Sequence, residues 1–166
     1  MPLLTAAGES VGLGSIVRGR PAVLILMRHL GCLPCREHLL EVAARRTELD
    51  HARVLCVTFV EPPLLAAYER ELALDGIDFY SDPARALYGA LGFERASFAR
   101  VWLHPAVWAR YAALIARGRR PHPPGQDVYQ LGGDAVLDAG GRLRWVYGSA
   151  GPEDRPTVHQ LLAALA

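Results

Sequence analysis

Residues 22–37 read AVLILMRHLGCLPCRE, and this stretch decides the fold. It opens with a continuous apolar run behind a Gly-Arg-Pro turn, which predicts a strand over 22–28 that is buried on both faces. Two cysteines, Cys32 and Cys35, follow in a C-x-x-C motif at the start of a helix predicted over about 34–48. A dithiol therefore lies where a buried strand meets a helix.

The pattern continues along the chain as alternating strands and helices. The elements predicted after the first helix are, in order, a strand over 53–60, a helix to about residue 74, a short strand over 77–80, a helix over 84–91, a helical insertion within 95–118, an irregular Pro- and Arg-rich loop over 119–125, a hairpin with strands at 135–137 and 143–147, and a closing helix over 157–165. This order predicts an α/β fold, a thioredoxin-like sandwich with a central mixed β-sheet flanked by helices and a helical insertion before the C-terminal hairpin.

Length and composition indicate one domain without highly charged partners. A chain of 166 residues suffices for a sizeable core but is short for two domains, so we expect a single domain over 1–166. The balance of 18 basic and 17 acidic side chains gives no electrostatic attraction to nucleic acid or to an anionic membrane surface. No apolar run is long enough to span a bilayer, and the N-terminus lacks the pattern of a secretory signal, so we expect a cytoplasmic location.

Three cysteines with one close pair, in the reducing cytoplasm, favour a redox dithiol over a structural disulfide framework. Cys32 is the predicted attacking thiol, because a cysteine exposed at the mouth of a helix faces the positive end of the helix dipole, which lowers its pKa. Cys35 lies one turn further on the same face, where it resolves a mixed disulfide or sulfenic acid on Cys32. The alternatives are a pair of inert buried thiols or half of a zinc site. No second pair of ligands has suitable spacing, so we expect neither a metal nor a cofactor.

Three other residues have predicted roles of their own. Arg28 is a candidate catalytic residue, since a guanidinium beside Cys32 favours the thiolate, and the alternative is a solvated charge at the end of the strand. For His29 we favour a cover for the end of the strand over a role in proton transfer. Cys56, which lies between apolar residues of the second strand, is predicted to be a core residue.

Two later groups of residues are candidates for contact with a substrate. Gly132 and Gly133 either let the backbone approach a bound substrate closely or form a turn. Four residues of the insertion either wall an apolar substrate pocket or, as we favour, belong to the core: Trp102, Trp108, Tyr111 and Leu114. Three histidines without ligand spacing are predicted to be structural or solvent-facing: His104, His122 and His159.

Four short blocks of sequence identify a family resemblance. They are Arg28-His29-x-Gly31-Cys32-x-x-Cys35-Arg36-Glu37, Leu87-Tyr88-x-x-Leu91-Gly92-Phe93, Gln130-Leu131-Gly132-Gly133-Asp134-x-Val136-x-Asp138 and Asp154-Arg155-Pro156. Together they resemble the peroxiredoxin-like AhpC/TSA family over nearly the whole chain. The resemblance implies a thioredoxin fold and an antioxidant function, and the family includes relatives similar to prostamide/prostaglandin F synthases. The Pro-x-x-x-Thr-x-x-Cys segment of typical peroxiredoxins has no matching threonine before Cys32.

The dithiol and the resemblance together predict a thiol-dependent oxidoreductase of the peroxiredoxin-like class. Cys32 attacks a peroxide or a disulfide, Cys35 resolves the product, and an external thiol donor such as thioredoxin or a low-molecular-weight thiol regenerates the dithiol. One alternative is the reduction of an endoperoxide, similar to that of prostaglandin F synthases. Another, from a different class, is a non-catalytic redox sensor or interaction module in which the dithiol state alters the 95–125 insertion and its partner contacts.

Overall fold

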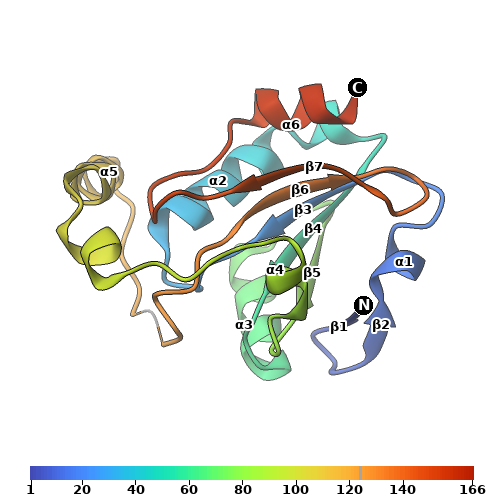
Figure 1. Cartoon of the computed structure of the whole chain (residues 1–166), viewed down its shortest axis with the longest axis horizontal. Coiled ribbons are helices and arrows are strands. Elements are labelled where there is room, and N and C mark those ends of the chain that lie inside the picture. Colours follow the sequence, from blue (N-terminus) through green and yellow to red (C-terminus); the bar gives the residue numbers. More distant parts are fainter. Residues whose placement is uncertain (124) are drawn as a thin grey trace.

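The computed structural model describes residues 1–123 and 125–166, which form a seven-stranded mixed sheet with helices on both faces (Figure 1). The strands are β1 (Pro2–Leu4), β2 (Ser10–Gly12), β3 (Ala22–Leu26), β4 (Arg53–Thr58), β5 (Ile77–Ser81), β6 (Gly133–Leu137) and β7 (Leu143–Gly148). The helices are α1 (Leu13–Ile16), α2 (Leu33–Ala44), α3 (Pro62–Leu72), α4 (Ala86–Ala90), α5 (Pro105–Ala116) and α6 (Val158–Leu165), with a 3-10 turn at Arg46–Leu49 and a π-helical turn at Ala99–Leu103. In the described part of the chain, none of the helices combines the length and the apolar character needed to cross a membrane.

Strand β3 lies inside the sheet because its side chains are all apolar and fully buried. The strand order is β2-β1-β5-β4-β3-β6-β7, in which β3 pairs in parallel with β4 and antiparallel with β6. Successive side chains of a strand point to opposite faces. Val23 and Ile25 therefore pack with α2, α3 and α6, whereas Leu24 and Leu26 pack with α1 and α4. The predicted mixed sheet flanked by helices is confirmed.

The predicted elements are present with shifted boundaries. Strand β3 ends at Leu26 rather than at residue 28, and α2 ends at Ala44, where a 3-10 turn replaces the last predicted helical turn. The sequence pattern did not reveal β1, β2 or α1, because elements of three or four residues are too short to show a period. β1 nevertheless widens the sheet by pairing antiparallel with β2 and with β5.

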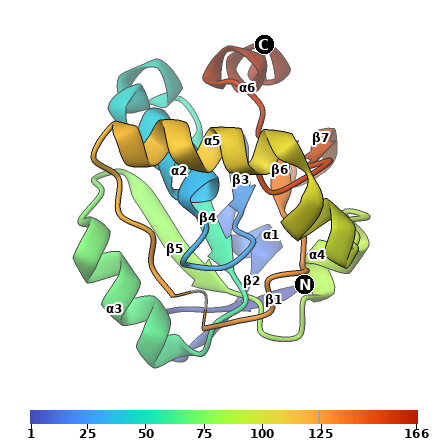
Figure 2. The same cartoon turned by 90° about the vertical axis from the view of Figure 1, so that its left-hand side faces the viewer.

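The predicted helical insertion is confirmed as the π-helical turn and α5. Pro105 begins α5, a position at which a helix needs no backbone N–H donor. Helix α5 contacts α2; Figure 2 shows it crossing in front of that helix, and Figure 1 shows it beyond one end of the sheet. The insertion is therefore placed beside the helix that begins at the dithiol.

Two glycines at the start of β6 let the strands of the sheet approach closely. A Cβ atom on Gly132 would overlap the Leu26 carbonyl oxygen, and one on Gly133 would overlap the Tyr147 carbonyl oxygen. Gly133 belongs to β6 and Gly132 directly precedes it, so the structure excludes the turn, one of the two alternatives that the sequence left open for this pair. The atoms that these two glycines approach closely are backbone carbonyl oxygens of the neighbouring strands β3 and β7.

Candidate functional site

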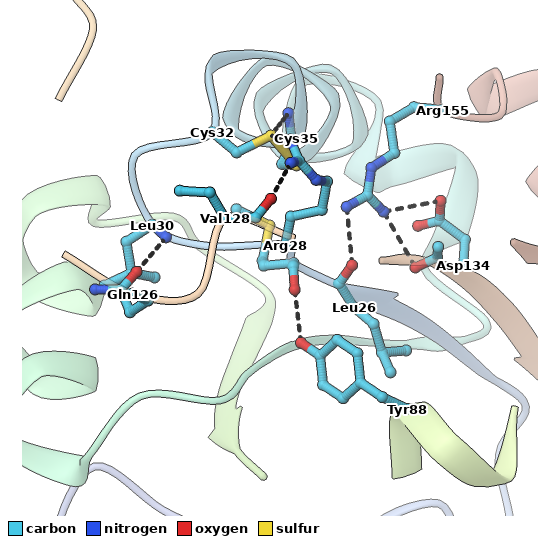
Figure 3. The surroundings of a disulfide bond; sticks show 12 residues. Leu26, Arg28, Leu30, Cys32, Cys35, Tyr88, Gln126, Val128, Asp134 and Arg155 are labelled. Atoms are coloured by element: carbon cyan, nitrogen blue, oxygen red, sulfur yellow. Dashed lines mark hydrogen bonds and ion pairs between the residues drawn. A yellow bond between two sulfur atoms is a disulfide. The ribbon is translucent and has the colours of Figure 1, made fainter. Parts of the chain in front are cut away.

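A disulfide joins Cys32 to Cys35 at the beginning of α2, with 5.3 Å between the two Cα atoms (Figure 3). Cys32 is the N-cap residue of α2, and its sulfur accepts a hydrogen bond from the Cys35 backbone N–H at 3.4 Å. Pro34 occupies the first turn, where a missing N–H costs no intrahelical bond. The Cys32 sulfur therefore lies at the positive end of the helix dipole.

Both cysteine side chains are fully buried, so the prediction that Cys32 is exposed is wrong. Backbone from a distant part of the chain covers the loop that precedes it. A Cβ atom on Gly31 would stand 2.6 Å from the His122 carbonyl oxygen, and the Leu30 N–H donates a hydrogen bond to Gln126 Oε1 at 2.9 Å. Contacts between residues so far apart in sequence leave no local pattern.

Arg28 lies directly beside the disulfide. Its Nη1 is 3.7 Å from the Cys32 sulfur, and its Nη2 donates a hydrogen bond to the Val128 carbonyl at 2.5 Å (Figure 3). Because its side chain is only 1% exposed, the alternative of a solvated charge is wrong. Burial lowers the pKa of Arg28 to about 10, so it stays positively charged at neutral pH. A cation in this position favours the thiolate of reduced Cys32.

Residues 126–130 form what we call the covering segment, because Gln126 and Val128 bond to residues of the loop between β3 and α2. Asp127 anchors this segment by accepting hydrogen bonds from Arg85 at 2.7 Å and from Arg95. Burial opposes the ionised form, but these hydrogen bonds dominate and lower the pKa of Asp127 to about 2. The covering segment is therefore held by ionic contacts at neutral pH. Apart from Gln130, which opens one of the four sequence blocks described above, no sequence motif marks it.

A cavity of about 140 Å³ opens between the dithiol loop and the insertion. The dithiol loop contributes Arg28, His29 and Gly31, and the insertion contributes Val101, Trp102, Val107, Trp108 and Tyr111. Trp102 and Trp108 are 39% and 53% exposed, so the prediction that these two residues belong to the core is wrong. Leu114 is fully buried, and for this residue the prediction is confirmed. Two tryptophans thus wall a pocket that is mainly apolar.

Tyr111 connects this cavity to the surroundings of the dithiol. Tyr111 belongs to α5 and lines the cavity together with Arg28. Burial raises the pKa of Tyr111, and the positive charge of Arg28 offsets part of that shift. The phenol is therefore protonated at neutral pH.

His29 lines the same cavity but is nearly buried. Burial and the adjacent Arg28 charge lower the pKa of His29 to about 4, so its ring is neutral at neutral pH. A neutral ring fits a cover for the end of the strand better than a source of protons. Three other histidines are exposed, in agreement with the prediction that they are structural or solvent-facing: His104, His122 and His159. Of these, His122 also lines the cavity.

A buried ionic cluster supports the end of β3. Asp134 is fully buried and pairs with His38 at 3.1 Å and with Arg155 at 3.5 Å. Arg155 also donates a hydrogen bond to the Leu26 carbonyl at 2.8 Å (Figure 3). Asp134 and Arg155 belong to separate sequence blocks that support the family resemblance, and their pairing was not apparent from the sequence.

Cys56 is a fully buried free thiol on β4. Burial raises the pKa of Cys56, which keeps it in the unreactive thiol form, and the prediction of a core residue is confirmed. Within residues 1–123 and 125–166, no group of three or more His, Cys, Asp or Glu side chains comes together as a metal site.

Comparison with known proteins gives sequence relatives of two kinds. Residues 42–150 match the family model described as AhpC/TSA antioxidant enzyme. Peroxiredoxin-like 2C of Homo sapiens is 32% identical over 104 residues, which cover 57% of this chain and 43% of that protein, less than half of its length. Prostamide/prostaglandin F synthase of Danio rerio is 28% identical over 170 residues, which cover 97% of this chain and 82% of that protein. The family match begins after the dithiol and does not include Cys32 or Cys35. The evidence for the roles of these two cysteines is therefore the geometry of the site.

Solved structures of peroxiredoxins share the fold. The bacterioferritin comigratory protein of Xanthomonas campestris, described for its alkyl peroxide reduction activity, aligns with a TM-score of 0.68 and 15% identity over 99% of this chain and 89% of its own. The peroxidoxin BcpB of Mycobacterium tuberculosis aligns with a TM-score of 0.69 and 14% identity over 99% of this chain and 90% of its own. These likenesses confirm the predicted thioredoxin-like fold class.

Proposed function

We propose that this chain, which belongs to the AhpC/TSA antioxidant enzyme family, is a thiol-dependent oxidoreductase that reduces peroxides with the Cys32–Cys35 dithiol. One observation supports this assignment above all others. The two cysteines form a disulfide at the start of α2, and the buried Arg28 guanidinium lies 3.7 Å from the Cys32 sulfur. This is the oxidised end state of a dithiol whose first thiol has two stabilising influences on its anion, the helix dipole and a cation.

The reduced dithiol supplies both electrons for the reaction. The Cys32 thiolate attacks the terminal oxygen of a hydroperoxide, the O–O bond breaks, and the other oxygen leaves and takes up a proton as an alcohol. Cys32 is then a sulfenic acid. Cys35 attacks the sulfenic sulfur, water is released, and the disulfide found here forms.

An external thiol completes the cycle by reducing this disulfide. Two thiol equivalents are needed, from thioredoxin or from a low-molecular-weight thiol, and a reducing compartment such as the cytoplasm supplies both. Because both cysteine side chains are buried, the attacking thiol reaches Cys32 only when the backbone around His122 and the covering segment moves away. We therefore expect reduction of the disulfide to be slower in this protein than in one with an exposed disulfide.

The cavity favours an organic hydroperoxide as the substrate. Val101, Trp102, Val107 and Trp108 provide apolar walls next to Arg28, and such walls add binding free energy for an alkyl group but none for hydrogen peroxide. The same walls support a second candidate, the reduction of a bulky endoperoxide, for which the prostamide/prostaglandin F synthase relative provides the precedent. There the dithiol delivers two electrons and two protons to the O–O bond, and two hydroxyl groups result.

The test is stopped-flow tryptophan fluorescence of the reduced protein, since Trp102 and Trp108 line the cavity. We expect an organic hydroperoxide to oxidise the wild type rapidly to the Cys32–Cys35 disulfide, identified by mass spectrometry. We expect Cys32→Ser to abolish this reaction and Cys35→Ser to stop at a sulfenic acid on Cys32. Full thiol-dependent turnover by Cys32→Ser would contradict the proposal. Stoichiometric oxidation without turnover would favour the redox-sensor alternative, and slow oxidation by every peroxide would favour disulfide exchange.

A further inference from the structure

We infer that the helical insertion docks on an anionic phospholipid surface, from which the protein takes phospholipid hydroperoxides as substrates. The docking does not depend on the redox chemistry, whereas the substrate class rests on the proposed peroxide reduction. Three features of residues 95–120 support the inference: their charge, their exposed apolar side chains and their position at the cavity.

The insertion is basic although the chain as a whole is nearly neutral. Residues 95–120 contain six arginines and no Asp or Glu, which leaves 12 basic and 17 acidic side chains in the rest of the chain. The balance over the whole chain, which gave no reason to expect an anionic surface as a partner, conceals this local excess. Three of the arginines are exposed and form no ion pair among the residues that the structure describes: Arg100, Arg117 and Arg120. Their charge is therefore available to an anionic partner.

The same segment exposes large apolar side chains. Five of the nine that are exposed in the described part of the chain belong to it: Phe98, Trp102, Leu103, Trp108 and Ile115. Trp108 donates a hydrogen bond to the Trp102 carbonyl at 2.7 Å, which joins α5 to the π-helical turn. Ile115 lies two helical turns after Trp108 and thus on the same side of α5. We call Trp102, Leu103, Trp108 and Ile115 the apolar patch. The exposed side of a helix in water is normally polar, so this patch indicates a partner that excludes water.

The insertion lies at one end of the molecule. Figure 1 shows α5 beyond one end of the sheet, with the hairpin of β6 and β7 reaching the opposite end, and Figure 2 views the molecule from the end that carries α5. Arg100 precedes α5 in the chain, and Arg117 and Arg120 follow it. A helix with aromatic and aliphatic side chains and nearby arginines suits the interface of a membrane, where Trp side chains are enriched and arginines attract anionic headgroups.

The cavity opens within the apolar patch, and this favours a lipid surface over a protein. Trp102 and Trp108 are exposed and also line the cavity, as does the buried Arg28 beside the Cys32 sulfur. A protein docked on the two tryptophans would cover this opening, whereas an acyl chain of a bilayer can enter it. A second copy of the chain is disfavoured, because a two-fold dimer through this patch would bring two basic insertions together.

The substrate class follows from this placement. A hydroperoxide group on an acyl chain of the underlying bilayer reaches the apolar cavity without crossing water. The reaction is the one given above for an organic hydroperoxide, with the phospholipid as the organic group. The alcohol that forms stays in the bilayer, and two thiol equivalents again restore the dithiol.

Co-sedimentation with vesicles tests the docking without any redox chemistry. We expect the wild type to bind vesicles of phosphatidylcholine and phosphatidylserine, and to bind much more weakly at high salt or to phosphatidylcholine alone. Replacing Arg117 and Arg120 together by glutamine should lower the partition coefficient by about 25-fold, about fivefold for each arginine. The matched control replaces Arg142 and Arg144, two exposed arginines of the β6–β7 hairpin, and should change it less than about twofold.

A second pair of variants tests the apolar patch. Leu103→Ser should lower the partition coefficient by about tenfold, whereas Leu143→Ser, at an exposed leucine of the hairpin, should leave it unchanged. Equal binding to both kinds of vesicle, or equal effects of the insertion and hairpin variants, would overturn the docking. A wild-type dimer in analytical ultracentrifugation that Leu103→Ser dissociates, with vesicle binding unaffected, would also overturn it, because the patch would then be a contact between copies.

Kinetics separate the docking from the proposed function. Leu103→Ser should lower kcat/KM for a phospholipid hydroperoxide in phosphatidylserine-containing vesicles by about tenfold. Its kcat/KM for cumene hydroperoxide in solution should match that of the wild type, since Leu103 is not among the described residues that line the cavity. Equal losses on both substrates, or no loss on the vesicles, would overturn the substrate class. A wild type that binds the vesicles but reduces neither peroxide would overturn the proposed function and leave the docking intact.

Discussion

Arg28 and Val128 lie 100 residues apart in the chain, yet the Arg28 guanidinium donates a hydrogen bond to the Val128 carbonyl oxygen at 2.5 Å. The same guanidinium lies 3.7 Å from the Cys32 sulfur. One side chain therefore contacts both the Cys32 sulfur and the covering segment. This relationship couples the charge of the sulfur to the position of the covering segment.

Replacement of Arg28 by methionine should raise the pKa of the Cys32 thiol. A neighbouring cation lowers the pKa of an acidic group by about one to three units, so its removal should raise the Cys32 pKa by a comparable amount. Thiolate absorbance against pH, measured in a Cys35→Ser background, checks this. Arg28→Lys keeps the charge and should show a smaller rise. An unchanged pKa in Arg28→Met would contradict the assignment of Arg28 as a stabiliser of the thiolate.

Truncation of Trp108 should reduce activity toward organic hydroperoxides selectively. In Trp108→Ala the lost apolar wall area should weaken the binding free energy of cumene hydroperoxide by roughly 1–2 kcal/mol. This corresponds to a loss of about tenfold in kcat/KM for that substrate. Hydrogen peroxide makes no such contacts, and its kcat/KM should stay the same. Phe98→Ala, a change at an exposed aromatic residue that does not line the cavity, is the control and should affect neither substrate. A loss of equal size for both peroxides would argue against the cavity as the substrate pocket.

Disruption of the buried ionic cluster should destabilise the protein strongly. Asp134→Ala leaves the Arg155 guanidinium buried without its carboxylate, a change that costs about 3–5 kcal/mol in the free energy of unfolding. Glu71→Gln breaks the half-exposed pair with Arg36 and should cost only about 0–1 kcal/mol. Urea unfolding of both variants measures the difference. Similar losses in the two variants would show that the cluster is not a special source of stability.

The free energy of unfolding should decrease as the pH is lowered, in part because of His29. Its pKa is lowered from 6.5 to about 4 on folding, so the unfolded chain binds a proton more readily than the folded protein. The stabilisation due to neutral His29 is full above pH 6.5 and is lost as the pH falls toward 4. His29→Gln cannot titrate, so its free energy of unfolding should decline less than that of the wild type between pH 7 and pH 4.5. Parallel declines in urea unfolding would contradict this.

The sequence contained enough information for the central part of the fold. The apolar run of β3, the C-x-x-C motif after it and the hairpin of β6 and β7 all have periods or turn residues that act locally. Three-residue strands such as β1 have no room for a period and depend on partners elsewhere in the sheet. Their existence was therefore outside the reach of local patterns.

The candidate site was predicted only in part for the same reason. Cys32 and Arg28 were found because a motif marks them, but the burial of Cys32 depends on backbone near His122. Trp108 looks the same in sequence whether it fills a core or walls a cavity, since an aromatic side chain suits both. Asp127 holds the covering segment through arginines more than 30 residues away, which no spacing rule connects.

The contact between Gly31 and the His122 carbonyl oxygen is made by main-chain atoms, and this has a consequence for how the protein tolerates change. Shielding that depends on main-chain fit survives almost any substitution at position 122, because every residue type presents the same carbonyl. At position 31 the opposite holds, since a single methyl group would act as a wedge between the two stretches of chain. Alanine at this position would convert a sheltered disulfide into one that solvent thiols reach, while the two cysteines themselves stayed unaltered.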